Sequence, residues 1–344
     1  MKIQFFVILI IVVAVVLGIS WYLDRNVFSV PSGETQILEN NDEEADGSNN
    51  STTSQNMTER EILVTDDVKH SIPLDEIISG GPGKDGIPSI DDPQFLSAEE
   101  ADFLKETDTG IGLVVGGEAR FYPYRILVWH EIVNDTINEK SVLVTYCPLC
   151  ATGVVFERRV GGEIQEFGVS GRLWQSNLLM YNRASNEDEE SLWSQVLGEA
   201  VLGPNTGEKL AIIRSNVVRW ESWQEEYPDT LVLSRETGSD RDYARDPYGG
   251  YYTSDSVSYG ATFNDSRLHP KELVHGIEID GQYKAYHGSA LSETTTDTFA
   301  GKEITISKTD VGEIEFTAEE EVIPHVTGFW FSWLAVHPDT ELYK

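Results

Sequence analysis

The feature that most restricts the fold is the spacing of apolar residues after residue 25, because it leaves no room for long helices. Apolar runs are short, and Gly, Asn-Asp or Asp-Gly turn signals separate them. The 3.6-residue periodicity of long amphipathic helices is missing. This pattern predicts a mainly β fold, a β-rich α+β architecture with a few short helices.

Individual segments give this prediction its detail. Leu231 to Ser234 has the composition of a strand, and Trp220 to Tyr227 predicts a short helix that Pro228 ends. Ser191 to Gln195 predicts a short helix or turn, and Phe329 to Leu334 predicts a buried strand or a short helix.

An apolar run at the N-terminus predicts a membrane anchor. Ile3 to Leu23 are 21 uncharged residues, mostly Ile, Val, Leu and Phe, which suffices to cross a bilayer as a helix. The run is longer than that of a usual signal peptide, and no clear Ala-x-Ala cleavage site follows it. We therefore expect residues 1–25 to be an uncleaved transmembrane helix. Lys2 in front and acidic residues behind predict a single-pass cell-membrane protein with a cytoplasmic N-terminus and an extracytoplasmic body.

The charge balance is strongly acidic and argues against one large class of partners. With 25 basic and 58 acidic residues, the net charge is −33, and such a surface repels nucleic acid. Residues 26–61 are acidic and rich in Ser, Thr and Asn, with little apolar surface, which predicts a disordered linker. Residues 62–344 form the body, which is long enough for one large domain or two packed ones.

Two segments of the body resemble each other and predict an internal duplication. Each reads as strand, Gly turn, strand, short connection and strand, so we expect duplicated β half-units at about residues 110–170 and 275–320. A chance likeness between two hairpins is the alternative. The matches are Gly117 with Gly281, Arg120 with Lys284, Tyr122 with Tyr286, Leu127 with Leu291 and, after a two-residue gap, Ser141–Val144 with Glu303–Ile306.

The chain has two cysteines, and both lie in the first copy. Cys147 and Cys150 form a C-x2-C turn between two strand-like runs, whereas the second copy has Thr309 where the first has Cys147. Such a turn points both sulfurs to one side, so it can chelate one metal ion or cycle between two thiols and a disulfide.

Strings of residues around this turn carry a further resemblance. They are Gly80–Pro82, Lys84–Pro93, Tyr122–Leu127, Trp129–Asp135, Val144–Cys150, Phe167–Gly171, Ser176–Tyr181 and Ser191–Gln195. In this order they resemble an exported family catalogued as domain of unknown function 3179, from about residue 75 to the C-terminus. Ala151 departs from the family pattern, which usually has Gly there, and residues 185–189 look like an insertion. The family brings no established activity, so the resemblance implies fold and boundaries more than function.

Our first functional prediction is a soft-metal site formed by Cys147, Cys150, His130 and Met180. Two thiolates, an imidazole and a thioether favour copper, with zinc as the second choice. Candidates for a missing ligand are Glu131, His287 and His325. The protein would then bind or handle the ion outside the cell membrane, with a metal donor as partner. Two of these side chains also have a structural interpretation, since a histidine can hydrogen-bond a carbonyl and a methionine can fill a core.

Two other functions stay open, so the sequence does not decide whether the protein is an enzyme. One is a dithiol/disulfide oxidoreductase that works with a redox partner, although the β-rich residues after Gly153 start no thioredoxin-like helix. The other is a non-catalytic envelope scaffold with a local disulfide, although so short a loop constrains the unfolded chain little.

A run of acids in the loop before the first copy is a weaker candidate site. Asp85, Asp91 and Asp92 carry the oxygen ligands that calcium prefers, but their spacing fits no EF-hand. Solvated loop carboxylates are the better interpretation.

Overall fold

The structure is a computed structural model that describes residues 28, 30–38, 60–309 and 312–344. The prediction of a mainly β fold is confirmed, because most described elements are short strands and each of the three α-helices among them has seven residues. Residues 1–25, the predicted anchor, lie outside the described residues, as does most of the predicted linker. Among the helices that are described, none has the length and apolarity needed to span a membrane.

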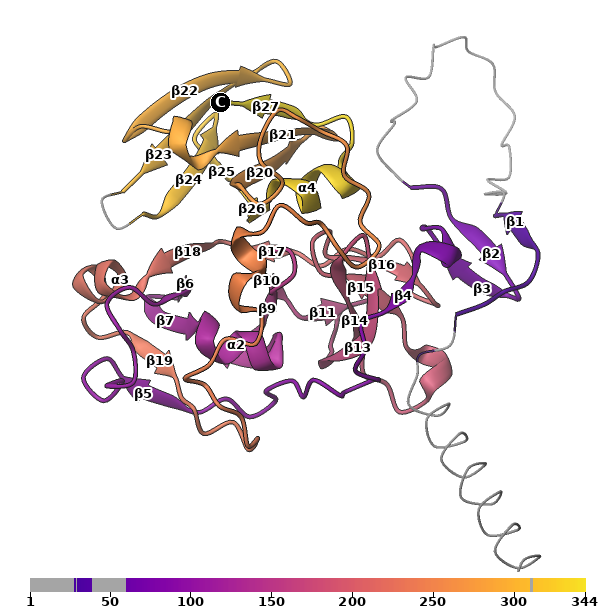
Figure 1. Ribbon diagram of the computed structural model, residues 1–344, viewed down its shortest axis with the longest axis horizontal. Coiled ribbons are helices and arrows are strands. Elements are labelled where there is room, and N and C mark those ends of the chain that lie inside the picture. The colour runs from indigo at the N-terminus through magenta and orange to yellow at the C-terminus, as the bar shows by residue number, and fades with distance from the viewer. Residues whose placement is uncertain (1–27, 29, 39–59, 310–311) are drawn as a thin grey trace, which may run out of the picture.

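A five-stranded sheet forms the lower part of the molecule in Figure 1. Its order is β18 (Ser215–Arg219), β6 (Thr109–Val115), β7 (Glu118–Pro123), β19 (Leu231–Leu233) and β5 (Phe95–Ser97). Two short helices belong to this part of the fold, α2 (Tyr124–His130) after β7 and α3 (Trp220–Glu226) after β18.

A second sheet runs from the upper part of the molecule into its centre (Figure 1). Its order is β27 (Glu341–Tyr343), β21 (Gln282–His287), β20 (Leu273–Ile279), β26 (His325–Phe329), β10 (Thr152–Glu157), β9 (Lys140–Cys147) and β8 (Ile132–Ile137), with β17 (Ile212–Ile213) paired to β10. The helix α4 (Trp330–Val336) follows β26 directly.

Two further large sheets complete the fold. An eight-stranded sheet has the order β1 (Thr35–Ile37), β2 (Leu63–Thr65), β3 (Val68–His70), β16 (Glu199–Leu202), β15 (Leu192–Ser194), β14 (Asn177–Asn182), β13 (Phe167–Trp174) and β4 (Ile78–Ser79). A four-stranded sheet has the order β22 (Thr294–Phe299), β23 (Lys302–Lys308), β24 (Ile314–Ala318) and β25 (Glu321–Ile323). The strands β11 (Arg159–Val160) and β12 (Glu163–Ile164) form a separate pair.

One pairing pattern occurs twice. In the order β18-β6-β7-β19 the first two contacts are antiparallel and the last is parallel, and the order β26-β20-β21-β27 has the same directions. The helix in each set places a tryptophan against a glycine of the central strand and bonds the indole N–H to a threonine 2.9 Å away. These are Trp223 with Thr230 and Trp333 with Thr340.

The aligned side chains of the two segments also make equivalent polar contacts. Arg120 Nη1 and the Tyr122 hydroxyl lie 2.6 and 2.5 Å from the same oxygen of Asp135. In the second set, Lys284 Nζ and the Tyr286 hydroxyl lie 2.7 and 2.9 Å from one oxygen of Asp297. A buried carboxylate needs such partners, because an unpaired charge is strongly disfavoured inside a protein.

Some local predictions hold and others are corrected. The helix predicted from Trp220 is α3, which ends just before Tyr227, and the strand predicted from Leu231 is β19. The segment after Ser191 is strand β15 rather than a helix or turn, because it pairs with β14 and β16 on its two sides. The connection after Pro123 is helix α2, which ends at His130.

We predict that Gly276→Ala destabilises the protein by about 1–3 kcal/mol, as overpacking of a core does. A Cβ at Gly276 would lie 2.4 Å from the Trp333 ring, which α4 holds in place. Urea unfolding measures the change. Gly250→Ala is the matched control, because a Cβ there meets nothing within 4 Å. Equal stability of the two variants would contradict the packing argument.

Candidate functional site

The two cysteines lie at the turn between β9 and β10, in the interior of the molecule. Cys147 ends β9, and both residues are free and almost fully buried, with 1% and 0% exposure. Their sulfurs are 3.5 Å apart, which is van der Waals contact. The C-x2-C turn therefore does bring both sulfurs to one side, as the sequence predicts.

Backbone and amide groups of the β13–β14 hairpin surround the thiols. The carbonyl oxygen of Ser176 lies 3.1 Å from Cys150 Sγ and 3.8 Å from Cys147 Sγ. The Asn177 side-chain amide lies 3.6 Å from Cys150 Sγ. Asn177 is itself fixed by Gln195, which also donates to Thr152 O at 3.0 Å. The Asn177 amide and the Ser176 carbonyl thus give the buried Cys150 sulfur both a donor and an acceptor.

The set of strands that contains β26 also contacts the cysteine turn. The backbone N–H of Phe329 donates to Cys150 O at 2.8 Å, where β26 runs into α4. The hydroxyl of Ser332 on α4 is buried near Cys150 and has no hydrogen-bond partner within the described chain. The site is thus built from both sets of strands.

The two thiols have different acidities. Burial raises the pKa of the Cys147 thiol well above its ordinary value, and its contact with Cys150 raises it further. Burial also acts to raise the pKa of Cys150, but hydrogen bonds from Cys147 and Asn177 and the nearby Ser332 outweigh it and lower the value. Cys150 is therefore the sulfur that carries the negative charge when the pair loses one proton.

Glu131 is a buried carboxyl beside this pair. It is 6% exposed and ends α2 in a left-handed conformation with φ 60°. Its carbonyl accepts from Tyr146 N at 2.8 Å, next to Cys147 in the chain, and its carboxyl makes no hydrogen bond or ion pair to the described residues. Burial first and then the charge of Cys147 raise the pKa of Glu131 well above its ordinary value.

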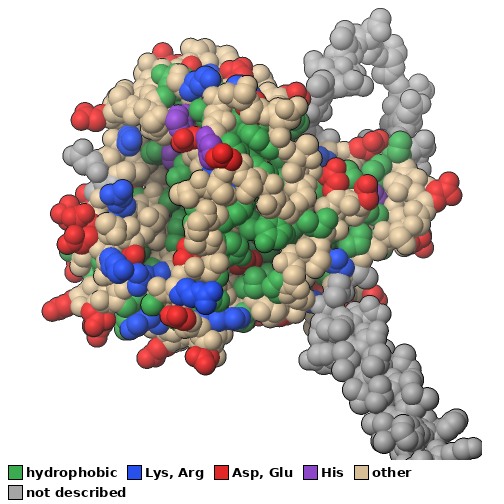
Figure 2. Space-filling model, viewed as in Figure 1, with side chains coloured by type: hydrophobic (Ala, Val, Ile, Leu, Met, Phe, Trp, Pro, Cys, Tyr) green, Lys and Arg blue, Asp and Glu red, His purple; other side chains and the backbone are tan. Residues whose placement is uncertain are grey.

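A short 3-10 helix, η3 (Gly249–Thr253), covers the outer side of the turn. The Tyr251 hydroxyl donates to Leu149 O at 2.8 Å, and Lys271 Nζ sits 3.4 Å from the centre of the Tyr251 ring. In Figure 1 this orange segment crosses the centre of the displayed face, where Figure 2 shows hydrophobic side chains gathered. The cover separates the thiols from solvent.

The structure does not bring the other predicted ligands into hydrogen-bond contact with the sulfurs. His130 Nδ1 bonds to Pro88 O at 2.7 Å, so it carries the proton, and Nε2 accepts from the Tyr243 hydroxyl at 2.7 Å. Burial lowers the pKa of His130, which keeps the ring neutral. Met180 is fully buried on β14 in the apolar cluster that also contains both cysteines.

Of the three reserve ligands, Glu131 lies beside the cysteines, whereas the two histidines have other surroundings. His287 bonds to Glu272 and Ser289, and the ring of His325 packs against Phe316. Across residues 60–309 and 312–344, no three His, Cys, Asp or Glu side chains are grouped as a metal site would need.

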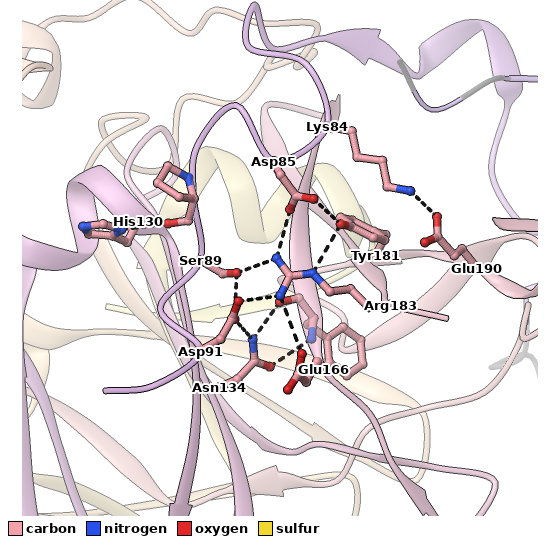
Figure 3. A network of polar contacts seen from close by, with 12 residues as sticks. Lys84, Asp85, Ser89, Asp91, His130, Asn134, Glu166, Tyr181, Arg183 and Glu190 are labelled. Carbon is pink, nitrogen blue, oxygen red and sulfur yellow. Dashed lines mark hydrogen bonds and ion pairs between the residues drawn. The ribbon is translucent and has the colours of Figure 1, made fainter. Parts of the chain in front are cut away.

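The three carboxylates of the acidic loop before β5 are exposed, as predicted, and two of them also make ion pairs. Arg183 reaches Asp91 at 2.6 Å and Asp85 at 3.1 Å, as Figure 3 shows. The Tyr181 hydroxyl donates to Asp85, and Asn134 donates to Asp91 at 2.7 Å. These contacts fix the loop whose Pro88 carbonyl orients His130, so the network has a structural role beside α2.

Comparison with known proteins places the chain in a family. The family model described as a protein of unknown function, DUF3179, matches residues 84–322. The chain belongs to the DUF3179 family. Searches of curated proteins and of solved structures give no match. The matched range contains the cysteine turn, Glu131, the β13–β14 hairpin and the η3 cover, whereas α4 lies beyond it.

Three residues of the site have no role in the sequence-based prediction. Asn177 and Gln195 lie inside strings that resemble the DUF3179 pattern, so a signal for them exists. Tyr251 lies in a Gly- and Tyr-rich stretch whose position over the turn depends on long-range packing. No local pattern indicates that contact.

We predict that Ala151→Gly stabilises the protein by about 0.5–1 kcal/mol. Ala151 has φ 48°, a left-handed conformation that a Cβ disfavours, and glycine adopts it without strain. Thermal unfolding measures the effect. Ala285→Gly, in the extended β21, is the control and should destabilise. A less stable Ala151→Gly form would show that the turn is not strained.

Proposed function

We propose that this DUF3179 protein is a dithiol/disulfide oxidoreductase with Cys147 and Cys150 as its redox pair. The observation that carries the proposal is the 3.5 Å contact between two free sulfurs of different acidity. The apolar run that we predict to be a membrane anchor supports a location outside the cell membrane, where thiol–disulfide exchange is common.

The chemistry assigns different roles to the two sulfurs. In the reducing direction, the Cys150 thiolate attacks a substrate disulfide, forms a mixed disulfide and releases one substrate thiolate. Cys147 then loses its proton and attacks Cys150, which closes the internal disulfide and releases the second substrate thiolate. Two electrons pass from the pair to the substrate, and both thiol protons end on the substrate thiols.

Glu131 is suited to exchange a proton with Cys147. The Glu131 carboxyl is buried beside that thiol, and its raised pKa lies closer to the pKa of a thiol than that of an ordinary carboxyl does. A substrate reaches the sulfurs only when the η3 cover moves, because both are buried in the closed form.

Binding of a soft metal ion is the second candidate, with copper preferred over zinc. The observation that favours it is the convergence of two sulfurs on one turn, with Glu131 as the nearest candidate for a third ligand. His130 would have to give up its bond to Tyr243 in order to join them.

Our first prediction for this site concerns redox cycling of the full chain in detergent. Reduced protein should reduce insulin disulfides, and mass spectrometry should then find a Cys147–Cys150 disulfide. Cys150→Ser should abolish the activity, and Cys147→Ser should stop at a mixed disulfide. The opposite outcome has two parts: the protein fails to reduce insulin, and anaerobically purified protein holds about one equivalent of copper or zinc that the double Ser variant lacks. That outcome would replace the dithiol proposal with the metal one.

A second prediction concerns Glu131 and pH. The folded state favours the protonated form of Glu131, because it raises the pKa of this carboxyl. This contribution to the free energy of unfolding is fully present below the unfolded-state pKa and is lost as pH rises through the folded-state pKa. Glu131→Gln should therefore become more stable, relative to the unmodified chain, between about pH 5 and about pH 8. Urea unfolding at both pH values measures this. The exposed Glu303→Gln is the control, and a trend shared by both variants would refute the assignment.

A further inference from the structure

Residues 28 and 30–38, which follow the predicted anchor, are fixed to the body of the protein. Phe28 and Val30 pack against the apolar cluster that contains both cysteines. The Gly33 N–H donates to Asp66 Oδ2 at 2.9 Å, and strand β1 pairs with β2 in antiparallel register. This segment therefore belongs to the folded body, although few residues separate it from the apolar run.

Arg172 on β13 holds the first described residue in place. Its Nη2 and Nε donate to the carbonyl oxygen of Phe28 at 2.7 and 3.1 Å. Burial lowers the pKa of this guanidinium, and no nearby acid opposes the change. A partly buried positive charge needs an acceptor, so the Phe28 carbonyl is a firm attachment point between the start of the segment and the body.

The chain between this attachment point and the predicted anchor is short. Residues 24–27, the tether, are all that separates Leu23, the last residue of the apolar run, from Phe28. An extended chain advances at most about 3.6 Å per residue, so Phe28 lies within about 18 Å of the hydrocarbon core that the anchor is expected to span. The headgroup layer alone occupies about 5–8 Å of that distance. This length leaves the body next to the lipid headgroups.

The acidic segment 39–59 does not act as a spacer between the anchor and the body. It joins the ends of two paired strands, because β1 precedes it and β2 follows it. The Leu38 N–H donates to Ile62 O at 3.2 Å, so both ends of the segment are held together. A change in its length therefore does not alter the distance between the membrane and the body, whereas a change in the length of the tether does.

The edge of the body beside the tether is acidic. Phe28 and Val30 line one cleft with Asp67, in the β2–β3 turn, and with Asp188 of the 3-10 helix η2 (Glu187–Glu189), which consists of three exposed acids. In Figure 1 strands β1 to β3 lie on the right, and the β22–β25 sheet lies on the opposite side, at the upper left. Anionic lipid repels such an edge, so a zwitterionic surface suits it better.

We propose that the short tether holds the edge formed by the β2–β3 turn and η2 against the lipid headgroups of the membrane, with the β22–β25 sheet turned away from them. The partner of this edge is a zwitterionic lipid surface. The proposal rests on the predicted anchor and does not depend on the thiol chemistry, so the two can fail separately.

Energy transfer to acceptor dyes on lipid headgroups tests this placement. The full chain is reconstituted in phosphatidylcholine nanodiscs, with a donor dye on the thiol of either Asp188→Cys in η2 or Val322→Cys in β25. Both positions are exposed and the native thiols are buried, so the dye reacts with the introduced thiol, and the unmodified chain measures any background. We expect the donor at position 188 to transfer at least about twice as efficiently as the donor at position 322.

A matched pair of insertions separates the tether from the acidic segment. About 20 Gly and Ser residues after Asn26 add a flexible length of roughly 25 Å, so transfer from the Asp188→Cys label should fall about twofold or more. The same insertion after Asn50 should leave it unchanged, because the ends of that segment are held together. The proposal is overturned by equal transfer from the two labels, by an Asn50 insertion as effective as the Asn26 one, or by a chain that does not enter the nanodiscs.

Discussion

The close approach of β10 and β26 is the contact on which the rest of the structure depends. It joins the two sets of strands through one pairing, Gly153 with Thr327, and one hydrogen bond, Phe329 N–H to Cys150 O. Glycines make the approach possible: a Cβ at Gly153 would lie 2.8 Å from the Tyr124 hydroxyl, and one at Gly328 would lie 2.9 Å from Thr152 Oγ1. Without this contact the thiols would lose the α4 side of their enclosure.

Burial explains why the two sulfurs differ although they share one turn. A buried thiolate is stable only where donors face it, and Asn177 and Cys147 face Cys150. Burial raises the pKa of Cys147 and of Glu131, and a charged neighbour, Cys150 for the thiol and Cys147 for the carboxyl, raises each further, so both keep their protons. The order of deprotonation thus follows from which neighbour points at which sulfur.

The sequence predicts what local patterns encode and fails where partners are distant in the chain. Short strands follow from apolar spacing, and the likeness of Arg120 and Tyr122 to Lys284 and Tyr286 is visible because identical roles keep similar residues. The approach of the Cys147 and Cys150 sulfurs also follows from their spacing. The bond from His130 to Tyr243 spans 113 positions, so no local pattern indicates that its ring nitrogens are already occupied. The same holds for the ion pair between Asp85 and Arg183, which are 98 positions apart.

The hydrogen bond from Phe329 to Cys150 has a mechanical consequence. The backbone of Cys150 belongs to the cysteine turn and also accepts a hydrogen bond from the second set of strands. Any rotation that lets the two sulfurs bond or separate pulls on that attachment, and the pull reaches α4 through the next residue, Trp330. The turn therefore joins the two sets of strands, and in the redox role that we propose, forming or breaking the sulfur–sulfur bond would also change the strain on this joint.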